Sequence, residues 1–239
     1  KKDLFLNTHK RLCFHGLDTY ATVFLNGEKI IEADNMFCKW EKDVSKILLQ
    51  GENELVLRFR SPIKEVLPDM EKYDYHLPAD NDKTGGVSPY TRKAPYHYGW
   101  DWGPCLVTSG IWKHVELIGW DLWDLDNLFI NQLEVNKKIA KLELEAHLIS
   151  DKNQNGFLTI HESEISFHKQ EKIELSKGKN RIKFQFDILN PRLWNPVGYG
   201  KQHLYNFHIE IQFGGYNDKL SKRIGLRKIL IERKDDKMG

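Results

Sequence analysis

The sequence contains little cysteine. Only Cys13, Cys38 and Cys105 occur among its 239 residues. This number and spacing do not provide the disulfide framework of a small secreted domain, and they fit no zinc-binding pattern. We therefore expect the three cysteines to be small, buried apolar side chains. The cysteine content does not indicate the cellular compartment.

An excess of charge of one sign is also absent, because 36 Lys and Arg residues balance 34 Asp and Glu residues. A nucleic-acid-binding protein would carry a clustered basic face, whereas the basic residues here form scattered pairs. No apolar run reaches the length of a membrane span, and the opening Lys1-Lys2-Asp3 is not the apolar core of a signal peptide. We expect a soluble protein with no nucleic acid and no membrane among its partners. A periplasmic, secreted or lysosomal-type compartment is compatible with this sequence.

Common metal-binding and nucleophile motifs are missing as well. The ten histidines include neither an HExxH motif nor a Cys/His cluster at ligand spacing. No nucleophile-elbow serine or phosphate-binding glycine loop occurs. Residues 80–86 begin like a calcium loop, but the twelfth position, which needs a bidentate acid, is Thr91. The sequence thus predicts a polar turn there, no metal and no cofactor.

Alternation of apolar and polar residues dominates the chain and predicts strands with one face on a core and one in water. Asn26-Gly27 follows one such stretch and predicts a hairpin, because both turn positions must accept positive φ. Gly214-Gly215 and residues 177–180 mark further turns. Residues 41–49 form at most a short helix. The fold class is therefore all-β, as packed sandwiches. The clearest alternating stretches are residues 54–60, 140–148, 182–188 and 205–213.

The alternation breaks at residues 121–126, which we interpret as a linker between a domain at 1–120 and another at 127–239. The second is predicted to contain about seven regularly spaced strands. In the first, six of the eight prolines lie between Pro62 and Pro104, which indicates a long irregular insertion. Long loops in compact domains are usually functional or disordered, and the density of aromatic residues favours function.

The run from Arg92 to Pro104 is the most informative part of this insertion. Trp100 and Trp102 flank Asp101, and glycines bracket the trio. An indole can cover the C–H face of a pyranose, and a carboxylate can accept hydrogen bonds from its hydroxyls. The run is consistent with part of a sugar pocket, or with a buried Trp corner whose Asp caps loop N–H groups.

This run resembles the signature of the β-mannosidase branch of glycoside hydrolase family 2. The resemblance extends over most of the chain, and the block from Gly99 to Pro104 favours mannosidase over galactosidase or glucuronidase. The other matching blocks are residues 14–27, 110–117, 190–205 and 223–227.

The resemblance implies a jelly-roll, galactose-binding-like β-sandwich followed by an immunoglobulin-like β-sandwich. It also implies that the first strands of the jelly roll precede Lys1 and that a catalytic (β/α)8 barrel follows Gly239. Retaining glycosidases use two carboxyl groups about 5–5.5 Å apart, and in this family both lie on the barrel. We therefore expect no catalytic residue here, and a segment that is inactive alone. Its partners would be the missing barrel and a terminal β-mannosyl saccharide, which the whole enzyme would cleave.

The resemblance also assigns the site residues. Asp101 would bind hydroxyls of the terminal mannose, and Trp100 and Trp102 would shape the pocket wall. For Arg92 and His97 in the same loop, the residue types themselves favour structural support. Arg92 could hold a carboxylate in a bidentate pair, and His97 could orient a neighbour.

Two neighbouring expectations concern residues outside this site. Lys93 is expected to be solvated. In the block at 190–205, Trp194 and Tyr199 are expected to pack rather than to bind a ligand.

Three alternatives remain open at the level of sequence. A standalone carbohydrate-binding module would bind sugar without a barrel. A purely structural pair of sandwiches would bury Trp100 and Trp102. A sister activity, β-glucosaminidase or β-galactosidase, would keep the domains and change the sugar.

Overall fold

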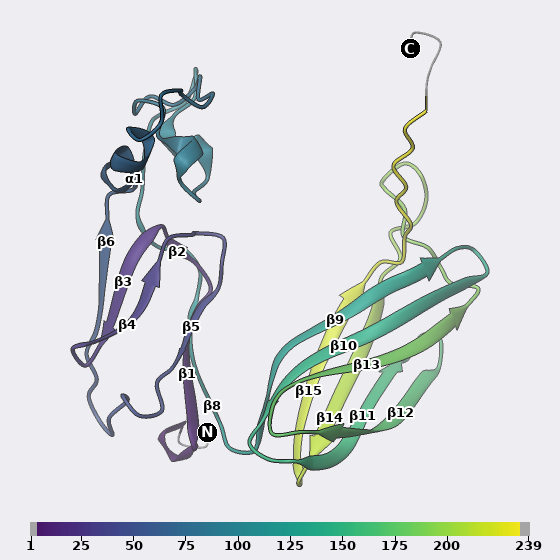
Figure 1. Ribbon diagram of the computed structural model, residues 1–239. Helices are drawn as coiled ribbons and strands as arrows, with labels where there is room; N and C mark the ends of the chain where they lie inside the picture. Colours follow the sequence, from purple (N-terminus) through teal and green to yellow (C-terminus); the bar gives the residue numbers. More distant parts are fainter. Residues whose placement is uncertain (1–3, 235–239) are drawn as a thin grey trace. The chain divides into compact units, whose positions relative to one another are not determined.

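The computed structural model describes residues 4–234, which form two compact units with their boundary along the chain between Asp121 and Leu122 (Figure 1). Both units are built from antiparallel sheets, which confirms the predicted all-β class. Among the described residues, no helix is long and apolar enough to cross a membrane. Of the cysteines, Cys13 is buried, Cys105 is half-buried and Cys38 is exposed. The expected burial is therefore wrong for Cys38, which lies in a turn rather than in a strand.

The first unit contains three small sheets with strand orders β5-β1-β8, β4-β3-β6 and β2-β7. Its core includes Phe14, Val23 and Ile31. Its elements are η1 (Leu4–Leu6), β1 (His9–Phe14), β2 (Leu17–Asp18), β3 (Tyr20–Leu25), β4 (Glu28–Ala33), β5 (Trp40–Asp43), β6 (Leu55–Arg60), α1 (Pro62–Met70), η2 (Ser88–Tyr90), η3 (Pro95–Tyr98), β7 (Gly110–Ile111) and β8 (Val115–Trp120).

The hairpin predicted at Asn26-Gly27 is confirmed. These two residues join β3 to β4 with φ values of 51° and 82°. Positive φ at both central positions matches the twist of the flanking strands. Local sequence alone is therefore sufficient to place this turn.

Residues 41–49, for which the sequence allowed at most a short helix, contain no helix. Residues 40–43 instead form β5 and pair with β1. The helix α1 begins at Pro62, after Ser61, whose hydroxyl accepts a hydrogen bond from the Lys64 amide. A proline at the first helical position costs no hydrogen bond, because the amide at that position has no partner within the helix. A short helix can therefore form inside the proline-rich insertion.

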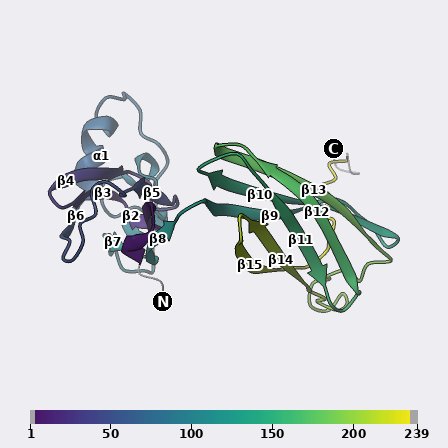
Figure 2. The ribbon, with the colours of Figure 1, turned by 90° about the horizontal axis from the view of Figure 1, so that it is seen from below.

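The second unit is a sandwich of two sheets, β13-β10-β9 and β12-β11-β14-β15, which face each other across one core (Figures 1 and 2). The alternation predicted in β10 and β14 is confirmed, because Leu142, Leu144, Phe207 and Ile209 all point inward. Its seven strands are β9 (Trp123–Val135), β10 (Ile139–Ser150), β11 (Gln154–Glu162), β12 (Phe167–Leu175), β13 (Gly178–Leu189), β14 (Tyr205–Phe213) and β15 (Tyr216–Ile224).

The connection between the units is shorter than the linker expected at residues 121–126. Strand β9 already begins at Trp123, which pairs with Ser150. The register of β9 against β10 then shifts between Asn127 and Leu125, where Asp126 is an extra residue. A bulge of this kind breaks the two-residue period, which explains why the strand was not visible in the sequence.

Candidate functional site

The predicted sugar-binding run lies in the long segment between α1 and β7, which gathers with α1 at the end of the first unit beyond the last residue of β6 (Figure 1). A small apolar cluster of Val66, Val87 and Tyr98 anchors this segment. Tyr98 is completely buried, and burial raises the pKa of its hydroxyl to about 12. The segment is therefore packed on a core of its own.

Lys83 holds the backbone on both sides of the Trp-Asp-Trp run. Its amide donates to the Tyr98 carbonyl oxygen at 2.9 Å, and its Nζ donates to the Gly103 carbonyl oxygen at 2.9 Å. Between them, Gly99 has φ 120°, and a Cβ there would lie 3.1 Å from the Asn81 carbonyl oxygen. The bracketing glycine is thus required by both conformation and space.

Trp100, Asp101 and Trp102 are all exposed. The residues Trp100 and Trp102 are 40% and 80% exposed, and their ring centroids lie 5.3 Å apart at an interplanar angle of 69°. The Asp101 Oδ1 accepts the Trp102 amide at 3.0 Å. Its other oxygen has no hydrogen-bond partner within residues 4–234. This exposure does not fit a buried Trp corner, and it leaves two aromatic surfaces and one carboxylate oxygen available to a ligand.

The two indoles line an open, mainly apolar cavity of about 570 Å³. Trp100 also borders a second cavity of about 500 Å³, which Asp80 and Lys93 help to line. Aromatic walls with a few placed polar groups are the usual anatomy of a small-molecule site. The first cavity is lined by Tyr96, His97, Trp100, Trp102, Gly103, Pro104 and Leu106.

Lys93 is buried rather than solvated, so that expectation is wrong. Its Nζ donates to both Asp18 carboxylate oxygens, at 2.5 and 2.6 Å, and to the Thr108 carbonyl oxygen at 2.8 Å. Asp18 is itself buried in β2. Sequence reasoning missed Asp18 as a site-supporting residue, because its partner lies 75 positions away. Its place in the matching block at residues 14–27 was the only available signal.

Arg92 and His97 contact the loop scaffold. Arg92 makes one exposed ion pair, Nη1 to the Asp34 Oδ2 at 2.9 Å, rather than a bidentate pair. The His97 Nδ1 lies 3.9 Å from the Asp18 Oδ2. Burial lowers the pKa of His97 and the Lys93 ammonium lowers it further, while Asp18 opposes them. Because its pKa falls below the ordinary value, His97 is mainly neutral at pH 7.

The polar turn predicted at residues 80–86 is present. The Asp82 carboxylate accepts the Thr84 amide at 2.7 Å and the Ser88 amide at 2.8 Å. Burial alone would raise the pKa of Asp82, but these hydrogen bonds bring it below its ordinary value. The carboxylate thus organises the loop beside Trp100.

The block at 190–205 behaves as predicted only in part. The Trp194 amide donates to the Leu226 carbonyl oxygen at 2.8 Å, and the Arg227 guanidinium lies 4.9 Å from the centre of its ring. Tyr199, in contrast, is 85% exposed. Packing is therefore confirmed for Trp194 and wrong for Tyr199, which lies in a tight turn outside the sheets.

Comparison with known proteins gives a consistent result. Residues 2–113 match the family described as "Glycosyl hydrolase 2 galactose-binding domain-like", and residues 124–227 match "Glycosyl hydrolases family 2". Beta-mannosidase B of Thermothelomyces thermophilus is 35% identical over 93% of this chain, and beta-mannosidase B of Emericella nidulans is 33% identical over 95% of it. The chain spans only 26% and 27% of these two relatives.

A solved structure agrees with these relatives. The β-D-mannosidase of Dictyoglomus thermophilum matches with a TM-score of 0.84 and 34% identity, over 95% of this chain and 28% of that one. The similarity therefore covers both units of this chain.

Proposed function

Because this chain belongs to glycoside hydrolase family 2, we propose that it is the non-catalytic amino-terminal segment of a retaining exo-β-mannosidase-like enzyme. The chain carries the galactose-binding-like domain and the immunoglobulin-like domain of that family. In this proposal, the loop bearing Trp100, Asp101 and Trp102 contributes one wall of the substrate pocket. The substrate is a saccharide with a terminal β-linked mannose.

One observation carries the proposal: a fixed loop presents two exposed indoles around a carboxylate with a free oxygen. Lys83 and the buried Lys93 hold this loop, so little conformational entropy is lost when a sugar binds. The indoles can cover the C–H face of the mannose, and Asp101 can accept its hydroxyl hydrogens. The two catalytic carboxyl groups of a retaining glycosidase belong, in this proposal, to the barrel outside residues 1–239.

The test is Asp101→Ala in the proposed full-length enzyme, with kcat/KM measured on an aryl β-mannoside. We expect a loss of more than about tenfold, which corresponds to about 1.4 kcal/mol of transition-state stabilisation. Asp69→Ala is the matched control, because Asp69 is an exposed aspartate on α1 whose contact is with Lys72. If kcat/KM fell by less than about tenfold in Asp101→Ala, and no more than in the control, Asp101 would not be part of the substrate pocket.

The exposure of Trp100 and Trp102 is also compatible with a standalone carbohydrate-binding module. Calorimetric titration of mannobiose into residues 1–239 separates the two functions. Saturable binding that Trp102→Ala abolishes would support the module. No binding, together with a loss of activity in the Asp101→Ala enzyme, would support the pocket wall.

A further inference from the structure

We propose that His15, His114 and Glu116 form a binding site for a divalent transition-metal ion, with Zn²⁺ as the best-suited ion. His15 directly follows β1 and His114 directly precedes β8, and the His15 amide donates to the His114 carbonyl oxygen at 3.1 Å. Phe14 pairs with Val115, so His15 and His114 continue the ladder as the next opposed pair. Glu116 lies two residues beyond His114 and therefore on the same face.

The three side chains already converge. The imidazoles of His15 and His114 stack with centroids 3.8 Å apart, and one ligand atom from each residue lies within 4.8 Å of the other two. The Nε2 atoms of His15 and His114 lie 3.1 and 3.2 Å from the two Glu116 oxygens. Zn²⁺ binds such atoms at about 2.0–2.2 Å with tetrahedral geometry, which separates ligands by roughly 3.3–3.6 Å. Only small side-chain rotations are therefore needed to bind the ion.

The chemistry of the three ligands selects the class of metal. Imidazole nitrogen suits Zn²⁺, Ni²⁺ and Cu²⁺, whereas Mg²⁺ and Ca²⁺ prefer all-oxygen sites. The side chains of His15, His114 and Glu116 are 28%, 61% and 45% exposed, which leaves room for water at the remaining coordination position. Within residues 4–234, this is the one group of three such side chains with this spacing.

A bound ion would tie together two strands that are distant in the sequence. His15 and Glu116 are separated by 101 positions, and β1 and β8 pair along their whole length. An ion that binds the folded pair and not the unfolded chain stabilises the fold by mass action. The expected role is structural, since neither histidine belongs to the sugar-binding loop.

The test is calorimetric titration of ZnCl₂ into the metal-free 239-residue chain. We expect saturable binding of one ion. His114→Ala should weaken this binding by at least about tenfold, because the loss of a residue that only hydrogen-bonds to a metal ligand already lowers metal affinity by about that factor. His161→Ala is the matched control. His161 and His208 form another stacked cross-strand pair, with ring centroids 4.9 Å apart. Among the described residues, no third ligand side chain lies close enough to complete a metal site with this pair. This variant should bind Zn²⁺ with unchanged affinity.

Thermal unfolding with Zn²⁺ or with EDTA provides a second readout. Zn²⁺ should raise the melting temperature of the unsubstituted chain and of His161→Ala, but not of His114→Ala. Circular dichroism verifies that His114→Ala is folded, which we expect because this side chain is mostly exposed. Equal Zn²⁺ affinity in His114→Ala and the unsubstituted chain would overturn the proposal, as would the absence of saturable binding.

Discussion

The Lys93 ammonium and the Asp18 carboxylate form a buried pair in which Nζ contacts both carboxylate oxygens, at 2.5 and 2.6 Å. The Lys93 side chain is 0% exposed and that of Asp18 is 6% exposed. A third hydrogen bond to the Thr108 carbonyl oxygen uses the remaining ammonium hydrogen. The pair therefore ties Lys93, seven residues before Trp100 in the proposed sugar-binding loop, to Asp18 in β2.

Replacing Lys93 by Ala should strongly destabilise the first unit. The substitution removes the only close cation, among the described residues, from the buried Asp18 carboxylate, which keeps the Thr19 hydroxyl hydrogen bond at 2.5 Å and the more distant His97 ring. Breaking one side of a buried pair costs about 3–5 kcal/mol. Urea denaturation of the 239-residue chain measures this cost. Arg92→Ala is the adjacent control: its ion pair with Asp34 is exposed, so the loss there should be about 0–1 kcal/mol. Equal losses in the two variants would contradict the role assigned to the buried pair.

Substitutions of Trp102 and Tyr98 should differ in whether they lower activity alone or also lower stability. Trp102 is 80% exposed, so Trp102→Ala should change the free energy of unfolding by less than about 0.5 kcal/mol. The proposed enzyme should nevertheless lose activity on an aryl β-mannoside, because the pocket wall is removed. Tyr98 is completely buried, and Tyr98→Ala should cost about 3–5 kcal/mol. Denaturation and kcat/KM measured on both variants provide the check, and a Trp102→Ala enzyme of full activity would contradict the pocket wall.

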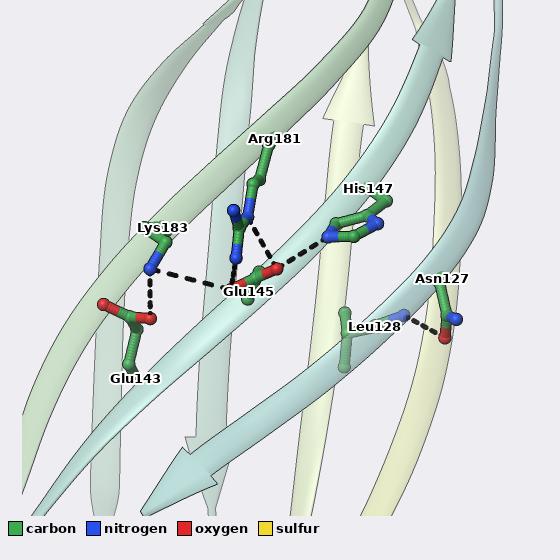
Figure 3. A network of polar contacts seen from close by, with 7 residues as sticks. All are labelled: Asn127, Leu128, Glu143, Glu145, His147, Arg181 and Lys183. Carbon is green, nitrogen blue, oxygen red and sulfur yellow. Dashed lines mark hydrogen bonds and ion pairs between the residues drawn. The ribbon is translucent and has the colours of Figure 1, made fainter. Parts of the chain in front are cut away.

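The Glu145 network on β10 and β13 should make the stability of the second unit depend on pH (Figure 3). Arg181 donates two hydrogen bonds to the Glu145 carboxylate, at 2.7 and 2.8 Å, and His147 contacts it at 2.7 Å. The hydrogen bonds from Arg181 and then from His147 lower the pKa of Glu145 from 4.5 to about 2, against a smaller opposing effect of burial.

The folded-state pKa is thus below the ordinary value, so the ionised network stabilises the fold above pH 4.5 and this contribution is lost as the pH falls through about 2. Glu145→Gln should lower the urea midpoint at pH 7, and its difference from the unsubstituted chain should shrink below pH 4.5. A difference that stays constant between pH 7 and pH 3 would contradict this assignment.

Gly156 should not tolerate a side chain. It pairs with Phe213 across β11 and β14, and a Cβ would lie 2.0 Å from the Gln212 carbonyl oxygen. Because that atom belongs to the backbone, the strands would have to separate, and Gly156→Ala should cost about 3 kcal/mol or more. Asn155→Ala, at the exposed neighbouring position, should have little effect on the same urea denaturation curve. Similar curves for the two variants would show that the strands adjust to a Cβ.

The loop around Asp101 shows how far sequence reasoning extends. Residue types and spacing singled out Trp100, Asp101 and Trp102 as candidates, and the family resemblance supplied their proposed role. Their exposure could not be predicted, because the segment has no regular alternation of apolar and polar residues. The helix α1 was missed because it is short and contains Pro68, a residue type that argues against a helix interior. The start of β9 was missed because Asp126 forms a bulge.

The sequence alone determined the all-β class, the Asn26-Gly27 hairpin and the family resemblance. These depend on local features, since the side-chain direction in a strand and the φ angles of a tight turn follow from neighbouring residues. Only the tertiary structure decided that Lys93 is buried against Asp18 and that His15 meets His114 and Glu116. Those contacts join residues about 75 and 100 positions apart. They exist because the antiparallel pairings of β2 with β7 and of β1 with β8 bring the two ends of the unit together.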